Sequence, residues 1–264
     1  MGHLISLEGR RALVTGGGRG IGRSIALALA NAGADVAVAA RSKAELETVA
    51  NEINALSRRG LWLVLDLMSR EAIGPGVKRA ADELGGLDIL VNNAGGTIHD
   101  GALLNPLDHD PRAFEDNIFL NLIQAFYATK AALPNMIRQK WGRIINIGSC
   151  GGDHHGMGPV SYATAKHGLV GFTRSMAYAV APHGININVI SAGLTESRAL
   201  DWEQMARWYK LESVEEVRKK VVEKTALKRV LHPDEYGPVA VLLASDQSAA
   251  ITGQVIGVDA GYLV

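Results

Sequence analysis

Thr15-Gly16-Gly17-Gly18-Arg19-Gly20-Ile21-Gly22 is the stretch of sequence that decides the fold. It joins a short apolar run at 11–15 to an apolar-periodic segment at 21–32, a pattern that predicts a strand followed by a helix. Glycines at such a junction let the backbone turn tightly and approach a pyrophosphate at the helix N-terminus. Tight packing of the strand on the helix is the alternative explanation. The loop lacks Gly-Lys-Ser/Thr, which disfavours a nucleoside triphosphate.

Short apolar runs alternate with longer helical patterns along the chain. The predicted strands lie at 11–15, 35–40, 61–65, 87–91, 143–147, 185–190 and 254–258. The predicted helices lie at 21–32, 42–57, 69–84 (disturbed at Gly74-Pro75-Gly76), 111–139, 160–181 and 234–244. This alternation predicts a parallel sheet covered on both faces, with right-handed crossovers. We therefore predict an α/β fold with one domain over residues 1–264, a doubly wound, Rossmann-type parallel sheet of about seven strands.

The segment 198–228 differs from the rest of the chain. Trp202, Met205, Trp208 and Tyr209 lie there among many charged residues. The pattern predicts a pair of helices outside the sheet, either a small helical lid over a substrate or an oligomer contact.

Composition limits the partners and the compartment. The 264 residues are 47% hydrophobic, and 27 Lys and Arg balance 27 Asp and Glu, so no basic excess points to nucleic acid or an acidic membrane surface. Cys150 is the single cysteine, which excludes an intramolecular disulfide and indicates a reducing compartment. Neither a signal peptide nor an apolar run of membrane-spanning length is visible. We expect a cytoplasmic protein, and the zero net charge is compatible with self-association.

The end of the second predicted strand bears on the nucleotide. A protein that selects NAD would carry Asp or Glu there for the ribose 2′-hydroxyl, whereas this chain reads Ala39-Ala40-Arg41. Arg41, with Arg19 as a second cation, would favour a 2′-phosphate. We therefore favour NADP(H), with NAD(H) as the alternative cofactor. The other interpretation of Arg41 is a solvated residue at the start of a helix.

Tyr162 and Lys166 are four positions apart in the predicted helix 160–181, so they share one face. A nearby ammonium favours the phenolate and lowers the pKa of a tyrosine toward the range useful for general acid–base catalysis. The alternative is a solvated pair on an amphipathic helix.

Three short motifs follow one another along the chain. Thr-Gly-x-x-x-Gly-x-Gly is present at 15–22, Asn92-Asn93-Ala94-Gly95 follows the fourth strand, and Ser149 stands thirteen positions before Tyr162 of Tyr-x-x-x-Lys. With these motifs the chain resembles the short-chain dehydrogenase/reductase family over essentially its whole length. The resemblance implies a catalytic set of Asn121, Ser149, Tyr162 and Lys166. Asn121 fits the family spacing better than Asn117 does.

The resemblance and the sequence pattern together predict the binding residues. The predicted cofactor contacts are Gly16, Gly18, Arg19, Gly20, Ile21, Gly22, Arg41, Asp66, Leu67, Asn93, Ala94, Gly95, Tyr162, Lys166, Gly193 and Thr195. The predicted substrate contacts are Ser149, His154, His155, Tyr162 and Trp202. Asp153, His154 and His155 are too crowded in one loop to suggest a metal site, and none is predicted.

Two departures from the family pattern stand out. Ser191-Ala192-Gly193 replaces the usual Pro-Gly after the sixth strand, and because proline fixes φ, its loss predicts a more mobile loop beside the nicotinamide. The closing strand runs into Asp259-Ala260-Gly261 in place of Asp-Gly-Gly, which affects C-terminal packing.

The predicted activity is NADP(H)-dependent interconversion of a secondary alcohol and a ketone, with Tyr162 as acid and base. The alternatives are a 3-oxoacyl-thioester reductase, an NAD-dependent sugar, polyol or steroid dehydrogenase, and a non-enzymatic module that senses NADP(H). The expected partner is a small carbonyl or alcohol substrate. The resemblance also implies a homo-oligomer, a tetramer or a dimer.

Overall fold

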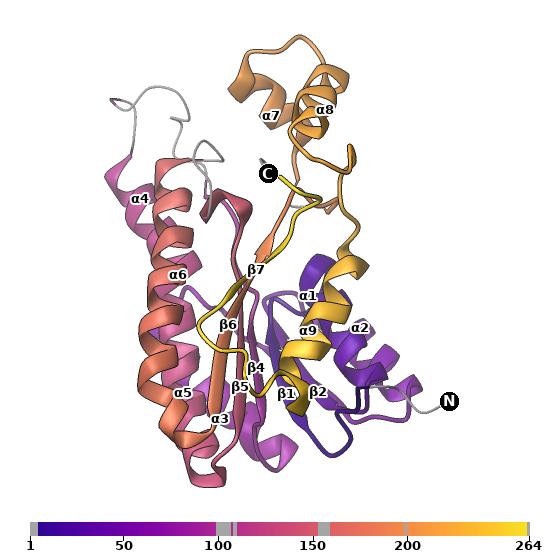
Figure 1. The fold of residues 1–264 in the computed structure, drawn as a ribbon, viewed down its shortest axis with the longest axis vertical. Helices are drawn as coiled ribbons and strands as arrows, with labels where there is room; N and C mark the ends of the chain where they lie inside the picture. Colours follow the sequence, from indigo (N-terminus) through magenta and orange to yellow (C-terminus); the bar gives the residue numbers. More distant parts are fainter. Residues whose placement is uncertain (1–4, 99–106, 108–109, 153–158, 198–199, 263–264) are drawn as a thin grey trace.

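A seven-stranded parallel sheet forms the centre of the molecule (Figure 1). The computed structural model describes residues 5–98, 107, 110–152, 159–197 and 200–262. The strands, in chain order, are β1 (Arg11–Thr15), β2 (Asp35–Ala40), β3 (Gly60–Val64), β4 (Ile89–Asn92), β5 (Gly142–Ile147), β6 (Ile185–Ala192) and β7 (Val255–Val258).

The strand order is β3-β2-β1-β4-β5-β6-β7, and every neighbouring pair is parallel. The chain therefore winds outward in one direction from β1 and in the other from β4. Ligands of such doubly wound sheets bind in the crevice at the carboxyl ends of the strands where this direction changes. The predicted doubly wound, Rossmann-type sheet is confirmed, and its switch point lies between β1 and β4.

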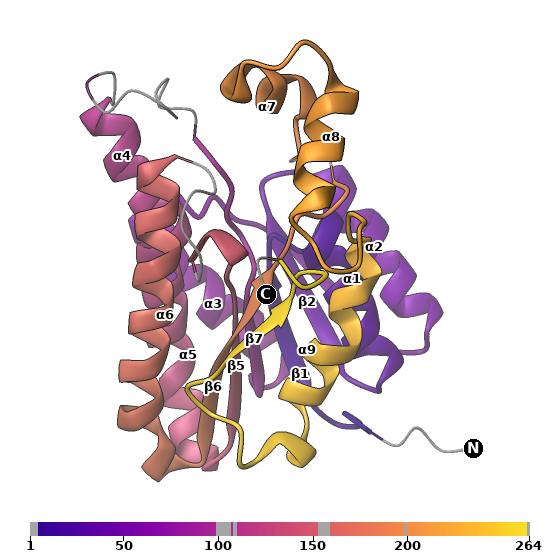
Figure 2. The ribbon, with the colours of Figure 1, turned by 45° about the horizontal axis from the view of Figure 1, so that its top comes forward.

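Helices cover both faces of the sheet (Figure 2). The α-helices are α1 (Gly20–Asn31), α2 (Lys43–Ala55), α3 (Arg70–Leu84), α4 (Pro111–Ile118), α5 (Gln124–Gln139), α6 (Val160–Val180), α7 (Trp202–Tyr209), α8 (Val214–Glu223) and α9 (Gly237–Ala244). Helices α1, α2 and α9 pack in one buried cluster on one face, and α3, α5 and α6 pack in another on the opposite face.

β2 shows why the sheet needs both layers. Val36 and Val38 belong to the cluster under α1, α2 and α9, whereas Ala37 and Ala39 belong to the cluster under α3, α5 and α6. Because successive side chains of a strand point to opposite faces, a strand with apolar residues on both faces has to be covered on both.

Two helices differ from their predictions. The predicted helix 111–139 is α4, then a π-helical segment at Phe119–Ile123, then α5. The predicted disturbance at Gly74-Pro75-Gly76 is wrong, because α3 continues through Pro75. Pro75 lies on the exposed face of α3, where water can solvate the carbonyl that loses its partner.

The predicted pair of helices outside the sheet is confirmed as α7 and α8, which stand above the carboxyl edge of the sheet (Figure 1). They share a small core of Met205, Val217 and Val221, with Trp202 and Tyr209 packed against it. Their function as a lid stays a prediction. Within the described ranges, no helix combines the length and the apolar character that crossing a membrane would require.

Candidate active site

The glycine loop joins β1 to α1 at the switch point of the sheet. Gly16 and Gly20 have φ values of +65° and +53°, in the left-handed region that side chains disfavour. A Cβ on Gly17 would lie 2.7 Å from Cγ1 of Val38, and one on Gly22 would overlap the carbonyl oxygen of Gly16. The Arg19 side chain does not cap α1, so the first N–H groups of this helix are left for an anion.

The end of β4 holds this loop in place. The amide nitrogen of Asn93 donates to the carbonyl oxygens of Thr15 and Gly16, at 3.0 and 3.1 Å. The Thr15 hydroxyl accepts the backbone N–H groups of Asn93 and Ala94, at 3.1 and 3.2 Å. Asn93 therefore uses its amide to shape the glycine loop. Thr15 was not predicted as a site residue, although its place directly before the glycines is the signal that could have found it.

Asn121 lies in the π-helical segment between α4 and α5 and is almost fully buried. Its side chain holds the backbone of Gly96 from both sides, accepting from the N–H at 3.0 Å and donating to the carbonyl at 2.8 Å. Asn117, one turn earlier, holds Ile98 in the same way, with both bonds at 2.8 Å. The loop after β4 is thus fixed by two asparagines, of which the sequence predicted one.

Ser149, Tyr162 and Lys166 meet at the carboxyl edge of β5. Ser149 follows β5, and its hydroxyl and the phenol of Tyr162 form a hydrogen bond. Lys166 Nζ lies 5.6 Å from the centre of the Tyr162 ring and donates to the Ile147 carbonyl at 2.9 Å.

Asn121 and Lys166 both lie close to Gly95. A Cβ on Gly95 would lie 2.8 Å from Oδ1 of Asn121 and 3.4 Å from Nζ of Lys166. The structure therefore brings all four predicted catalytic side chains together, and Asn121 rather than Asn117 is the asparagine beside Lys166.

Burial dominates the electrostatics of Tyr162 and Lys166. It raises the pKa of Tyr162, and the hydrogen bond with Ser149 opposes that rise. It lowers the pKa of Lys166 to about 8. The expected lowering of the Tyr162 pKa is therefore wrong for this structure, because the desolvation of the phenol outweighs the influence of its neighbours.

Predicted nucleotide contacts line the carboxyl ends of β2 and β3. Arg41 and Asp66 are exposed there, next to buried Leu67. Nη1 of Arg19 lies 3.8 Å from Oε1 of Glu45, so this carboxylate competes with an anionic ligand for Arg19. Oδ1 of Asp66 accepts the N–H of Met68 at 3.0 Å, which leaves its other oxygen for a ligand.

The loop after β6 is held without a proline. The N–H of Gly193 donates to Val258 at 2.9 Å, and Leu194 and Leu231 form a further backbone bond of 2.9 Å. The Thr195 hydroxyl lies 2.5 Å from that of Tyr236. These contacts, which the sequence did not suggest, take over part of the restraint that proline would supply.

The family model of short chain dehydrogenases matches residues 10–206. The chain belongs to the short-chain dehydrogenase family. Its four predicted catalytic residues and its glycine loop lie within the matched part.

Short-chain dehydrogenases similar to this chain carry several names. A 3-oxoacyl-[acyl-carrier-protein] reductase of Aquifex aeolicus is 37% identical over 97% of this chain and 98% of its own, and one of Escherichia coli is 36% identical over 98% and 100%. A solved putative short-chain alcohol dehydrogenase of Sinorhizobium meliloti is 39% identical, with a TM-score of 0.87 and 98% of both chains covered. A putative gluconate dehydrogenase of Agrobacterium tumefaciens is 31% identical, with a TM-score of 0.88 and coverages of 98% and 97%.

Three of the predicted substrate contacts stay predictions. His154 and His155 lie outside the described residues. Trp202 lies at the start of α7, with the Arg218 guanidinium 4.8 Å from the centre of its ring. Within the described parts of the chain, no group of three or more His, Cys, Asp or Glu side chains could hold a metal ion.

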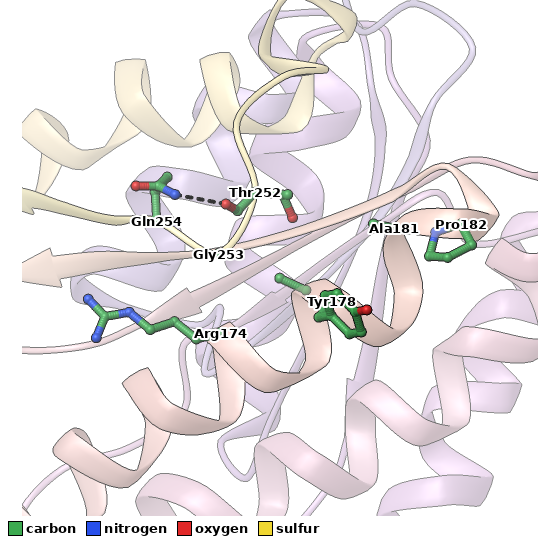
Figure 3. A pocket seen from close by; sticks show the side chains of 8 residues that line it. Arg174, Tyr178, Ala181, Pro182, Thr252, Gly253 and Gln254 are labelled. Carbon is green, nitrogen blue, oxygen red and sulfur yellow. Dashed lines mark hydrogen bonds between the residues drawn. The ribbon is translucent and has the colours of Figure 1, made fainter.

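A groove of about 660 Å³ lies far from this chemistry, near the C-terminal end of α6. Figure 3 shows Arg174 and Tyr178 of α6 along one side of it and Thr252, Gly253 and Gln254 along the other. Since Tyr162 is about three turns before Arg174 and four turns before Tyr178 on α6, this groove is separate from the predicted active site.

Proposed function

We propose that this short-chain dehydrogenase reduces a ketone with NADPH, and that the ketone is a 3-oxoacyl thioester. The observation that carries the proposal is the meeting of Ser149, Tyr162 and Lys166 beside the glycine loop. The substrate class rests on the relatives named 3-oxoacyl-[acyl-carrier-protein] reductase, which match nearly the whole chain.

The residues of the crevice fit a dinucleotide. A side chain on Gly16, Gly17 or Gly22 would collide with its neighbours, and the first turn of α1 lacks a side-chain cap. These features suit a pyrophosphate at the helix N-terminus. When bound, the nicotinamide supplies the hydride that protein side chains cannot. Arg19 and Arg41 would hold the adenosine end, and Lys166 would contact the nicotinamide ribose.

Tyr162 would protonate the carbonyl oxygen as it gains negative charge. The raised pKa of this phenol suits that task, because it keeps the proton in place at neutral pH. Ser149 would hold the same oxygen by a hydrogen bond. Asn121, beside Lys166, would hold a water that returns a proton to the Lys166 side chain after Lys166 has given one up.

A second candidate is oxidation of an alcohol or a sugar acid. It is favoured by the similar solved structures, which are named putative short-chain alcohol dehydrogenase and putative gluconate dehydrogenase. The four catalytic residues would serve either reaction, because the fold and the set do not select the substrate.

A substrate panel tests the proposal. We expect acetoacetyl-CoA to be reduced with NADPH at a kcat/KM well above that of simple cyclic ketones, and above that of gluconate oxidation with NADP⁺. Absorbance of the reduced nicotinamide gives the rates. Faster gluconate or alcohol oxidation would favour the second candidate. Tight NADPH binding without turnover of any compound would favour the sensing module.

The cofactor preference has its own test. Arg41→Ala is expected to lower kcat/KM for NADPH by roughly 10- to 100-fold, because a charge-assisted hydrogen bond is worth about 1.5–3 kcal/mol. The value for NADH should change less than about threefold, since NADH lacks the 2′-phosphate.

Arg59→Ala is the matched control for Arg41→Ala. Arg59 is also exposed, but it precedes β3 at the amino edge of the sheet. Equal losses with the two cofactors in Arg41→Ala would show that Arg41 does not select the 2′-phosphate.

The sequence also predicts how the protein assembles and where in the cell it lies. The dimer or tetramer and the cytoplasmic location stay predictions from the sequence. Exposed Phe126 of α5 and Val160 and Tyr178 of α6 are large side chains that an assembly could cover.

A further inference from the structure

Tyr236 is a fully buried tyrosine whose hydroxyl faces the loop after β6. It ends a 3-10 turn, η5 (Pro233–Tyr236), that precedes α9. Its Oη lies 2.5 Å from the Thr195 hydroxyl and 3.4 Å from the Gly193 carbonyl oxygen. The Thr195 hydroxyl lies 2.9 Å from the same carbonyl.

These three oxygens share only two protons, so the donors can be assigned. The Thr195 hydroxyl makes the shorter bond to the Gly193 carbonyl and therefore donates to it. The Tyr236 hydroxyl then donates to Thr195. In this arrangement the proton of Thr195 is already used, and its oxygen keeps one lone pair for a further partner. Thr195 can therefore accept a hydrogen bond from a ligand but not donate one.

The position of Tyr236 is itself held from two sides. The Ser24 hydroxyl of α1 donates to Oδ1 of Asp234 at 2.5 Å. Both nitrogens of the Arg229 fork bond the carboxylate of Glu235, each at 2.6 Å. The turn η5 thus connects the helix behind the glycine loop with the loop that carries Thr195.

The sheet places Thr195 at the nicotinamide half of the predicted crevice. Arg19 and Arg41 lie at the ends of β1 and β2, toward the adenosine half. Thr195 follows β6, next to β5, whose end carries Ser149. The nicotinamide carboxamide offers an N–H₂ donor on that half, and a lone-pair acceptor is its complement.

We propose that Tyr236 is a positioning residue: it fixes the Thr195 hydroxyl as an acceptor for the carboxamide N–H₂ of the nicotinamide. This inference rests on the proposed NADP(H)-dependent function. It adds a residue outside the predicted site and assigns the direction of a hydrogen bond.

A double-mutant cycle on the intact protein tests the pair. Dissociation constants for NADP⁺ and for 2′,5′-ADP, which lacks the nicotinamide half, are measured by calorimetry. Tyr236→Phe and Thr195→Val are each expected to weaken NADP⁺ by roughly 3- to 10-fold, the size of one hydrogen bond. When Thr195→Val is already present, adding Tyr236→Phe should raise the dissociation constant for NADP⁺ by less than about a further twofold. Binding of 2′,5′-ADP should stay unchanged, and Thr195→Ser should restore NADP⁺ binding.

A cofactor analogue tests the direction of the bond without altering Tyr236. The 3-acetylpyridine analogue of NADP⁺ keeps the carbonyl of the carboxamide and replaces the N–H₂ by a methyl group. Thr195→Val should therefore weaken the binding of NADP⁺ but not the binding of the analogue. Equal weakening of both would mean that Thr195 donates to the carbonyl, and would overturn the proposal.

Other outcomes separate this inference from the proposed function. Additive effects of the two substitutions, or an equal loss of 2′,5′-ADP binding in Tyr236→Phe, would mean that Tyr236 acts on the general structure only. Tyr262→Phe, which alters another buried tyrosine, is the control for loss of a hydroxyl and should leave NADP⁺ binding unchanged. Wild-type protein that binds neither NADP⁺ nor NAD⁺ would instead refute the proposed function.

Discussion

Tyr162→Phe is expected to lower kcat by roughly 10³-fold or more while the protein still binds NADPH. The substitution removes only the hydroxyl, so the ring keeps its place on α6. The alkoxide that forms on the substrate would then lack its proton donor, and the hydrogen bond with Ser149 would be lost.

Single-turnover rates and a separate NADPH titration measure the two effects. Tyr178→Phe is the matched control, because Tyr178 lies on the same helix with 90% of its surface exposed. It should retain wild-type activity. Near-normal turnover in Tyr162→Phe would refute the role of Tyr162, whereas loss of NADPH binding together with turnover would indicate a disturbed site.

The sequence was sufficient to predict the strands, the helices between them and the parallel, doubly wound sheet, because each of these elements has a local pattern. The strand β2 is apolar at five of its six positions, and the longer periodic segments between strands match helices. Such patterns are local consequences of burial on both faces, so they are visible without any tertiary information.

The details that the sequence did not predict depend on contacts between distant segments. The π-helical segment that carries Asn121 looks like ordinary helix in the sequence, since its wider turn depends on what it packs against. The bond between Thr195 and Tyr236 joins residues 41 positions apart. No periodicity or motif connects two such positions, and only the folded chain brings them together.

The spacing of Tyr162 and Lys166 shows the same limit for electrostatics. A separation of four residues on a helix predicts that two side chains are neighbours. It does not predict how deeply they are buried, and burial decides the direction of both pKa shifts. The sequence therefore predicted that these side chains lie together, but it did not predict the direction in which the pKa of Tyr162 shifts.

Lys166→Met is expected to alter both turnover and the pH dependence of stability. For turnover we expect a loss of roughly 10²- to 10³-fold, the scale of removing a preorganised charge from an active site. The effect on stability follows from the buried ammonium, which is only 4% exposed.

The direction of the stability effect follows from the pKa values. In the folded protein the pKa of Lys166 is lowered from 10.5 to about 8. Below pH 8 both states are protonated, and the folded state bears the full cost of a buried charge. Between pH 8 and 10.5 the unfolded state binds more protons, so the free energy of unfolding rises with pH. From pH 7 to 9.5 this gain amounts to about 2 kcal/mol in wild-type protein.

Urea unfolding without cofactor, at one protein concentration, measures this gain. Wild-type protein should become about 2 kcal/mol more stable relative to Lys166→Met as the pH rises from 7 to 9.5. The comparison cancels the titration of the groups that the two unfolded chains share, including the tyrosines that begin to ionise near pH 9.5. Lys219→Met, which removes an exposed lysine of α8, should show the same pH dependence of the free energy of unfolding as wild-type protein. A constant difference between wild type and Lys166→Met across this range would mean that Lys166 keeps an ordinary proton affinity. The low-dielectric site around the Tyr162 phenol would then not exist.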